Sequence, residues 1–226
     1  MKNRLSQTPK RQSRQRRRTK NTHQKLLEAA RAVFAEKGMD LARIDEISER
    51  ADVGKGTLYY HFKGKPQIIM ELMKSILSEL MAAIEEKCGD ASDIQSLLYN
   101  LIGAHIEFFS KCWEDFVLYF QGRSDLTLQE SYSGIETPFI EYLECIEGLL
   151  ESVIKYRLPQ SVLRRIACAI TGFVSGYYSF ASIDSQDENI DEVFASLQGA
   201  MATSLERFIK EALPSTESGG SCYENL

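Results

Sequence analysis

The chain has 226 residues, of which 43% are hydrophobic, and its ten Tyr, eleven Phe and one Trp suffice for a buried core. The net charge of −5 is unevenly spread: residues 1–65 carry 17 Lys and Arg against 7 Asp and Glu, and the remainder carries 10 against 25. This asymmetry predicts that one basic part approaches a polyanion, and the lack of a signal peptide or a long apolar run predicts a cytoplasmic protein without a membrane partner.

Residues 1–20 contain nine Lys and Arg and no acidic residue. Like charges at this density repel one another and bury nothing, so we expect a disordered basic arm. Two interpretations stay open: a solvated tail, or an arm that neutralises phosphates or enters a minor groove. A helix is predicted next, from Thr22 as N-cap to Lys37, with Gly38 ending it.

Two short helical patterns flank a break between Ala42 and Phe62. Ile44, Ile47 and Ala51 give the first an apolar face, Asp52-Val53-Gly54 interrupts the period, and Leu58 and Phe62 lie on one side of the second. Gly54 is free to adopt a backbone conformation that most residues avoid. Helix, short turn and helix is the geometry that places a second helix in a major groove.

The outward side of the second helix combines cations, phenols, a hydroxyl and an imidazole, which suit phosphate oxygens and base edges. A loose helix-turn-helix pattern alone is a weak signal, but the run KGTLYYHF is much less generic. Gly56 would allow close approach of the backbone, and three further cations would hold phosphates. The predicted DNA-binding residues are Arg43, Lys55, Gly56, Thr57, Tyr59, Tyr60, His61, Lys63 and Lys65.

With these motifs the chain resembles the TetR family of transcriptional regulators, over the segments His23–Gly38, Ile44–Phe62 and Lys63–Ile69. The resemblance implies an all-α fold with a three-helix DNA-binding head and a larger C-terminal domain for ligand binding and dimerisation. Two positions depart from the family pattern. Arg43 stands where a Thr or Ser is usual, and Gly54, itself an acceptable N-cap, stands where Ser is frequent.

A helix is predicted from Lys65-Pro66 to about Cys88, and by resemblance it links ligand and DNA. Five further helices are expected at about 92–110, 112–122, 128–157, 160–183 and 188–212, with breaks at Gly122–Thr127 and Ile183–Glu188 and a kink or break at Pro138. The predicted domains are 1–20 (basic arm), 21–66 (DNA-binding head), 67–213 (ligand and dimer domain) and 214–226 (disordered tail).

Aromatic residues recur at helical spacing in the acidic part of the chain. Such stripes are more often core than a ligand site, but this set is more aromatic than a helical bundle needs, and small organic ligands bind cavities of this kind. The predicted ligand-binding residues are His105, Phe109, Trp113, Phe116, Phe120, Arg123, Tyr142 and Tyr177.

Cys168, Gly172, Gly176 and Ser179 form a stripe of small residues that permits close helix packing. It serves either packing within one chain or a two-fold dimer face, and the family resemblance favours the homodimer. A symmetric dimer would present two recognition helices to a palindromic site.

An enzyme is not expected, because the chain lacks a Gly-rich phosphate loop, G-x-S-x-G and H-E-x-x-H; the five Cys show no metal spacing, and no cofactor is predicted. The sequence therefore predicts a repressor that binds a palindromic operator and is released by a small hydrophobic or aromatic effector. Two alternatives are a redox-responsive regulator acting through a thiol and a helical binding protein whose basic arm binds polyanions without sequence preference.

Overall fold

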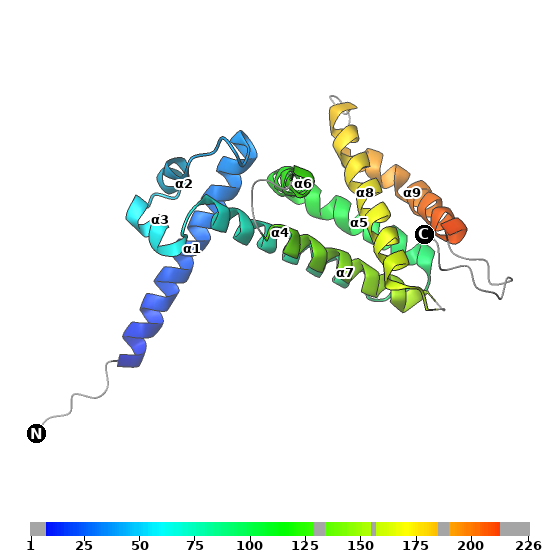
Figure 1. Ribbon diagram of the computed structural model, residues 1–226, viewed down its shortest axis with the longest axis horizontal. Helices are drawn as coiled ribbons and strands as arrows, with labels where there is room; N and C mark the ends of the chain where they lie inside the picture. The colour runs from blue at the N-terminus through cyan, green and yellow to red at the C-terminus, as the bar shows by residue number, and fades with distance from the viewer. Residues whose placement is uncertain (1–7, 129–133, 155–156, 185–189, 213–226) are drawn as a thin grey trace, which may run out of the picture. The chain divides into compact units, whose positions relative to one another are not determined.

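The computed structural model describes residues 8–128, 134–154, 157–184 and 190–212, and all regular elements in these ranges are α-helices. The predicted all-α fold is thus confirmed. The helices are α1 (Thr8–Lys37), α2 (Ile44–Arg50), α3 (Lys55–His61), α4 (Lys65–Cys88), α5 (Ile94–Lys111), α6 (Trp113–Leu128), α7 (Glu136–Val153), α8 (Gln160–Asp184) and α9 (Ile190–Ala212) (Figure 1). The predicted tail 214–226 lies outside the described residues. No helix in these ranges is long and apolar enough to cross a membrane.

Helix α1 starts earlier than the sequence predicts. It begins at Thr8 instead of Thr22, so that residues expected in a disordered arm belong to one helix of 30 residues. Arg, Lys and Gln are good helix formers, which explains how the pattern extends into a segment without apolar residues. The predicted end is confirmed: Gly38 has a φ of 83°, and its N–H donates to the Phe34 carbonyl at 2.8 Å.

Two predicted breaks in the C-terminal part are wrong. Helix α6 continues through Gly122–Thr127 to Leu128. A Cβ on Gly122 would lie 2.6 Å from Met73 Sδ, so this glycine marks close packing against α4 and not a turn. Helix α7 begins only at Glu136, which places Pro138 in its first turn, where a missing N–H breaks no helical hydrogen bond.

The chain divides into two compact units. Unit 1 comprises residues 1–80 and 111–142, and unit 2 comprises 81–110 and 143–226. In unit 1 the core includes Phe34, Ile47 and Leu58, each fully buried. In unit 2, Glu147 of α7 is 97% buried and accepts hydrogen bonds from Gln160 and Arg164 of α8. The predicted functional boundary between residues 66 and 67 stays a prediction.

Candidate nucleic-acid interface

The turn between α2 and α3 obtains its shape from an unexpected residue. Asp52, not Gly54, takes the left-handed conformation, with a φ of 53°. Asp tolerates this region better than most residues, whereas Gly54 is extended (φ −69°, ψ 148°) and caps α3. The conformational freedom of Gly54 is therefore not used in this turn. The Gly54 carbonyl accepts the Thr57 N–H at 2.8 Å and so starts the helix.

Helix α3 separates a buried side from an exposed side. Leu58 is fully buried and Phe62, directly after the helix, is 1% exposed. The phenols point the other way: Tyr59 is 55% exposed and Tyr60 is 77% exposed. Lys55, Gly56 and Thr57 are exposed too. Two adjacent exposed phenols beside an exposed cation and hydroxyl form a contiguous patch, so this side of α3 has the character of an interface.

His61 lies at the edge of that exposed side. Its ring centroid is 5.5 Å from that of His23 on α1, and His23 in turn stacks on Phe62 at 4.8 Å. His23 Nε2 lies 2.9 Å from a carboxylate oxygen of Glu71 on α4. Burial and then the charge of His23 lower the pKa of His61, so this group favours its neutral form. The cluster joins α1, α3 and α4, a packing role that its sequence pattern did not indicate.

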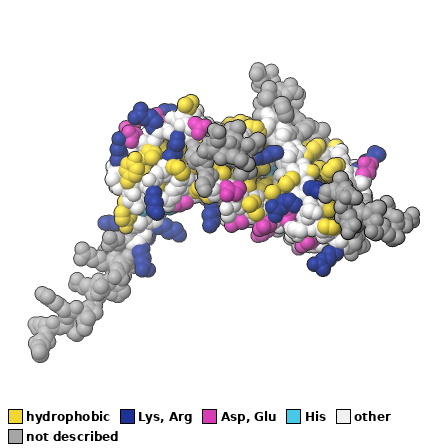
Figure 2. Space-filling view, viewed as in Figure 1, with side chains coloured by type: hydrophobic (Ala, Val, Ile, Leu, Met, Phe, Trp, Pro, Cys, Tyr) yellow, Lys and Arg dark blue, Asp and Glu magenta, His cyan; other side chains and the backbone are white. Residues whose placement is uncertain are grey.

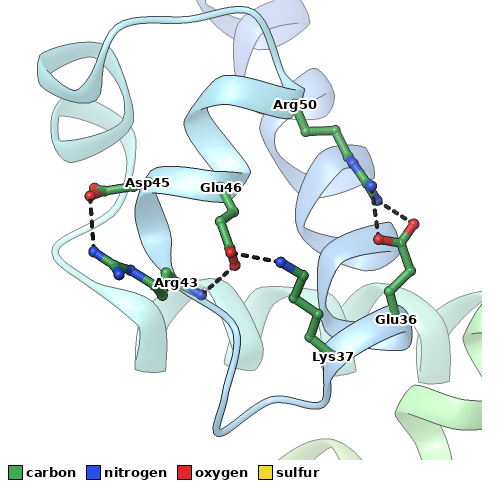
Figure 3. Close-up of polar contacts among 6 residues, drawn as sticks. All are labelled: Glu36, Lys37, Arg43, Asp45, Glu46 and Arg50. Carbon is green, nitrogen blue, oxygen red and sulfur yellow. Dashed lines mark hydrogen bonds and ion pairs between the residues drawn. The ribbon is translucent and has the colours of Figure 1, made fainter.

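Arg43 is the N-cap residue of α2, although its side chain makes no capping hydrogen bond. Instead the Glu46 carboxylate accepts the Arg43 backbone N–H at 3.1 Å and binds Lys37 Nζ at 2.6 Å (Figure 3). The guanidinium of Arg50 on α2 donates two hydrogen bonds to the Glu36 carboxylate of α1, with nitrogen–oxygen distances of 2.7 and 2.8 Å. The Glu46 contacts hold the first turn of α2, and the Arg50 pair ties its last turn to α1, while the Arg43 side chain stays 74% exposed.

Asp45 places a negative charge among the predicted phosphate-binding cations. Its Oδ2 lies 2.7 Å from Lys55 Nζ and 3.8 Å from an Arg43 nitrogen. This carboxylate holds both cations near one point of the surface, and a DNA phosphate would have to compete with it for them. Sequence reasoning missed this role, because Asp45 looks like an ordinary acidic residue in the first turn of a helix.

The two cations at the start of α4, Lys63 and Lys65, differ in what they contact. Lys65 Nζ donates to the carbonyls of Asp40 at 2.7 Å and Ala42 at 3.3 Å, so it ties α4 to the α1–α2 connection. The Lys63 side chain is exposed, and in the described part of the chain no carboxylate pairs with it. Lys63 is therefore the stronger candidate for a phosphate contact.

Helix α6 supports the same region of unit 1 from residues far along the chain. Arg31 Nε of α1 lies 3.1 Å from Oδ1 of Asp115 and forms an ion pair with it, but the two groups are not aligned for a hydrogen bond. The Asp115 side chain is almost fully buried. Burial raises the pKa of Asp115 despite the nearby guanidinium. Gln121 accepts the Met39 backbone N–H at 3.2 Å. No local sequence signal could indicate pairs separated by more than 80 residues.

The predicted ligand-binding residues do not fall in one unit. His105 and Phe109 belong to unit 2, and both are buried. The predicted residues of α6 and α7 belong to unit 1, where Phe116 and Tyr142 are buried while Trp113 is 49% and Phe120 is 44% exposed. Arg123 is half-buried, and the side chain of Tyr177 lies outside the described residues. The ligand assignment stays a prediction.

The predicted dimer residues lie on α8. Cys168 is exposed, and Gly172, Gly176 and Ser179 are half-buried. The Ser179 hydroxyl donates to the Ser175 carbonyl at 2.8 Å within the same helix. Their role at a dimer interface stays a prediction. Among the described residues, no cluster of His, Cys, Asp or Glu could hold a metal ion.

The exposed α3 next to a short turn defines a helix-turn-helix DNA-binding regulator, and comparisons with known proteins agree. Residues 26–72 match the family model described as bacterial regulatory proteins, tetR family. The HTH-type transcriptional regulator YvdT of Bacillus subtilis is 24% identical over 82% of this chain and 97% of its own length. The N-terminal segment of this chain is thus that of a TetR-family transcriptional regulator.

Solved structures share the fold. FadR, a fatty acid degradation regulator from Bacillus halodurans, aligns with a TM-score of 0.65 at 19% identity and covers 81% of this chain and 93% of its own. FadR from Bacillus subtilis, solved in complex with stearoyl-CoA, aligns with a TM-score of 0.63 at 20% identity and covers 80% and 96%.

Burial of His105 predicts a loss of stability in acid. Its Nδ1–H donates to the Leu101 carbonyl at 2.7 Å, and desolvation lowers the pKa of His105 to about 4 from an ordinary 6.5. As the pH falls, His105 is therefore protonated near pH 6.5 in the unfolded chain but only near pH 4 in the folded chain. The free energy of unfolding should fall by roughly 3 kcal/mol through this group as the pH drops from 6.5 to 4.

Urea unfolding at several pH values checks this. His105→Gln should flatten the decline below pH 6.5. The control His23→Gln changes a half-buried histidine of the other unit, leaves His105 in place and should keep the contribution of His105 to the decline. Identical pH profiles for His105→Gln and the unmodified protein would contradict the assignment.

Proposed function

We propose that this regulator is a homodimeric repressor that holds a palindromic operator through α3 and releases it when a small hydrophobic or aromatic molecule binds the C-terminal helices. The observation that carries the proposal is the exposed side of α3, where Tyr59 and Tyr60 lie opposite the buried Leu58. It would act in the cytoplasm, where the DNA is, and by binding rather than by catalysis.

Repression is supported by relatives. The transcriptional repressor KstR2 of Rhodococcus jostii is 25% identical over 58% of this chain, and the fatty acid metabolism regulator protein of Bacillus subtilis is 24% identical over 64%. These names, and the stearoyl-CoA in the FadR complex, favour an effector with a large apolar part. Within unit 1 the proposed contacts would come from Phe116 and Tyr142, with Arg123 as a polar partner.

A role for Arg164 in binding the phosphates of an acyl-CoA is not favoured. Its guanidinium is engaged by the buried Glu147 and lies 3.6 Å from Glu144. A thiol-based redox input is not favoured either. Burial raises the pKa of both Cys88 and Cys145 to about 11, and a protonated thiol is a poor nucleophile.

In the proposed mechanism α4 is the connecting element. Its residues 65–80 belong to unit 1 and its residues 81–88 to unit 2, so this one helix contains residues of both units. An effector with higher affinity for one tilt of α4 would change the separation of the two recognition helices.

Selection of bound sequences from random duplex DNA at near-physiological salt tests the proposal. A dimeric repressor should enrich a palindrome whose half-sites lie one helical turn or a multiple apart. Bound duplex should then be released by long-chain acyl thioesters, sterols or aromatic compounds tested in turn. Binding without any enriched sequence, lost as salt rises, would overturn the proposal in favour of unspecific polyanion binding.

Tyr60→Ala should weaken binding to the selected operator roughly ten- to hundredfold, the range expected for the loss of one base contact. The melting temperature should stay unchanged, because the phenol is 77% exposed in the free protein. Tyr99→Ala is the matched control, since Tyr99 is 46% exposed on α5, far along the chain from α3. Equal operator affinity in a gel shift for both variants would exclude Tyr60 from the interface.

Gly56→Ala separates stability from DNA binding. No atom lies within 4 Å of a Cβ added at Gly56, so the free protein should keep its stability or gain up to about 1 kcal/mol from the better helix former. Operator affinity should fall, because the methyl group occupies the space of the approaching DNA. Gly199→Ala on α9, equally open, is the control. Unchanged affinity for Gly56→Ala would show that the DNA does not approach this backbone closely.

A further inference from the structure

The N-terminal half of α1 extends beyond the rest of the DNA-binding head. The apolar residues that bury α1 begin at Leu26, whereas the helix begins at Thr8. Figure 1 shows α1 as one unbroken helix that continues past α2 and α3. Seven Lys and Arg and no acidic residue lie between residues 8 and 20. Core packing does not account for this segment.

The cations in and beside the helix-turn-helix are largely neutralised by carboxylates in unit 1. Lys37 pairs with Glu46, Arg50 with Glu36, and Lys55 with Asp45. The extension differs: Arg16, Arg17, Arg18 and Lys20 are all exposed, and in the part of the chain that the structure describes no ion pair engages them. Figure 2 shows Lys and Arg side chains gathered on α1 next to the grey N-terminal residues. Uncompensated positive charge is therefore concentrated on this helix.

Helical geometry directs part of this charge toward the recognition helix. His23 of α1 stacks on Phe62 and lies beside His61, so this side of α1 adjoins the C-terminal end of α3. Residues three and seven positions before His23 share its side of the helix, and these are Lys20 and Arg16. At 1.5 Å per residue they lie about 5 and 10 Å further along the axis. A duplex held by α3 would place its backbone within reach of both.

We infer that the N-terminal half of α1 is a second DNA-binding element, in which Arg16 and Lys20 bind backbone phosphates beside the groove that α3 occupies. This inference rests on the proposed function and adds a contact that the helix-turn-helix does not supply. Phosphate contacts strengthen binding and fix the orientation of a protein on DNA without discriminating between bases. A helix formed in the free protein also loses less conformational entropy on binding than a disordered arm would.

The salt dependence of operator affinity tests the inference with the full chain. Each phosphate neutralised contributes about 0.9 to the slope of log Kobs against log salt concentration. The double variant Arg16→Ala/Lys20→Ala should lower the magnitude of the slope by about 1.8 per protomer, and hence by about 3.6 for a dimer. Alanine preserves the helix, so circular dichroism should not change. The control Arg207→Ala/Lys210→Ala removes the same charge from α9 and should leave the slope unchanged.

The ratio of operator affinity to random-duplex affinity should stay nearly constant in the Arg16/Lys20 variant, because phosphates carry no base identity. An unchanged slope would overturn the inference. Tighter operator binding by the variant would overturn it too, since this result would mean that the extension binds acidic residues of its own chain. Failure of the proposed function would look different: the unmodified protein would not distinguish the selected operator from random duplex.

Discussion

The recognition surface depends on how a seven-residue helix is held in place. An isolated helix as short as α3 would not be stable in water, because nucleation costs more than so few hydrogen bonds return. The burial of Leu58 and Phe62 supplies the missing stabilisation, and the stacking of Phe62 on His23 connects α3 to α1. Since these two side chains fix the rotation of α3 about its axis, they also determine that Tyr59 and Tyr60 face outward.

Electrostatics in the DNA-binding head are divided between two elements. Around α2 and α3 most cations already have carboxylate partners, and Asp45 lies between Arg43 and Lys55. Because these cations are already paired, unspecific attraction to phosphates adds little to the affinity of this surface. The pairing therefore favours discrimination between sequences over affinity for any duplex. The extension of α1 carries the uncompensated charge instead. In our account it strengthens binding to any duplex, whereas α3 selects the sequence.

Local signals in the sequence predicted much of this structure. The apolar spacing in α2 and α3, the stop at Gly38 and the family motif all depend on residues close together in the chain. A prediction failed where tertiary contacts decide: Gly122 looks like a helix break but packs against Met73. Tertiary contacts also give Lys65 two backbone carbonyl partners that the sequence did not indicate, and its phosphate contact stays a prediction. The Asp115 carboxylate near Arg31 illustrates the same limit, because no periodicity relates residues so far apart.

Our central claim is that α3 discriminates bases while surrounding cations hold phosphates. Comparing the sequence preferences of two variants tests it most directly, by repeating the random-duplex selection with Thr57→Ala and Lys63→Ala. The account predicts that Thr57→Ala relaxes the preference at one position in each half-site, whereas Lys63→Ala weakens binding evenly and leaves the preferred sequence intact. An unchanged preference for Thr57→Ala together with an altered one for Lys63→Ala would contradict it.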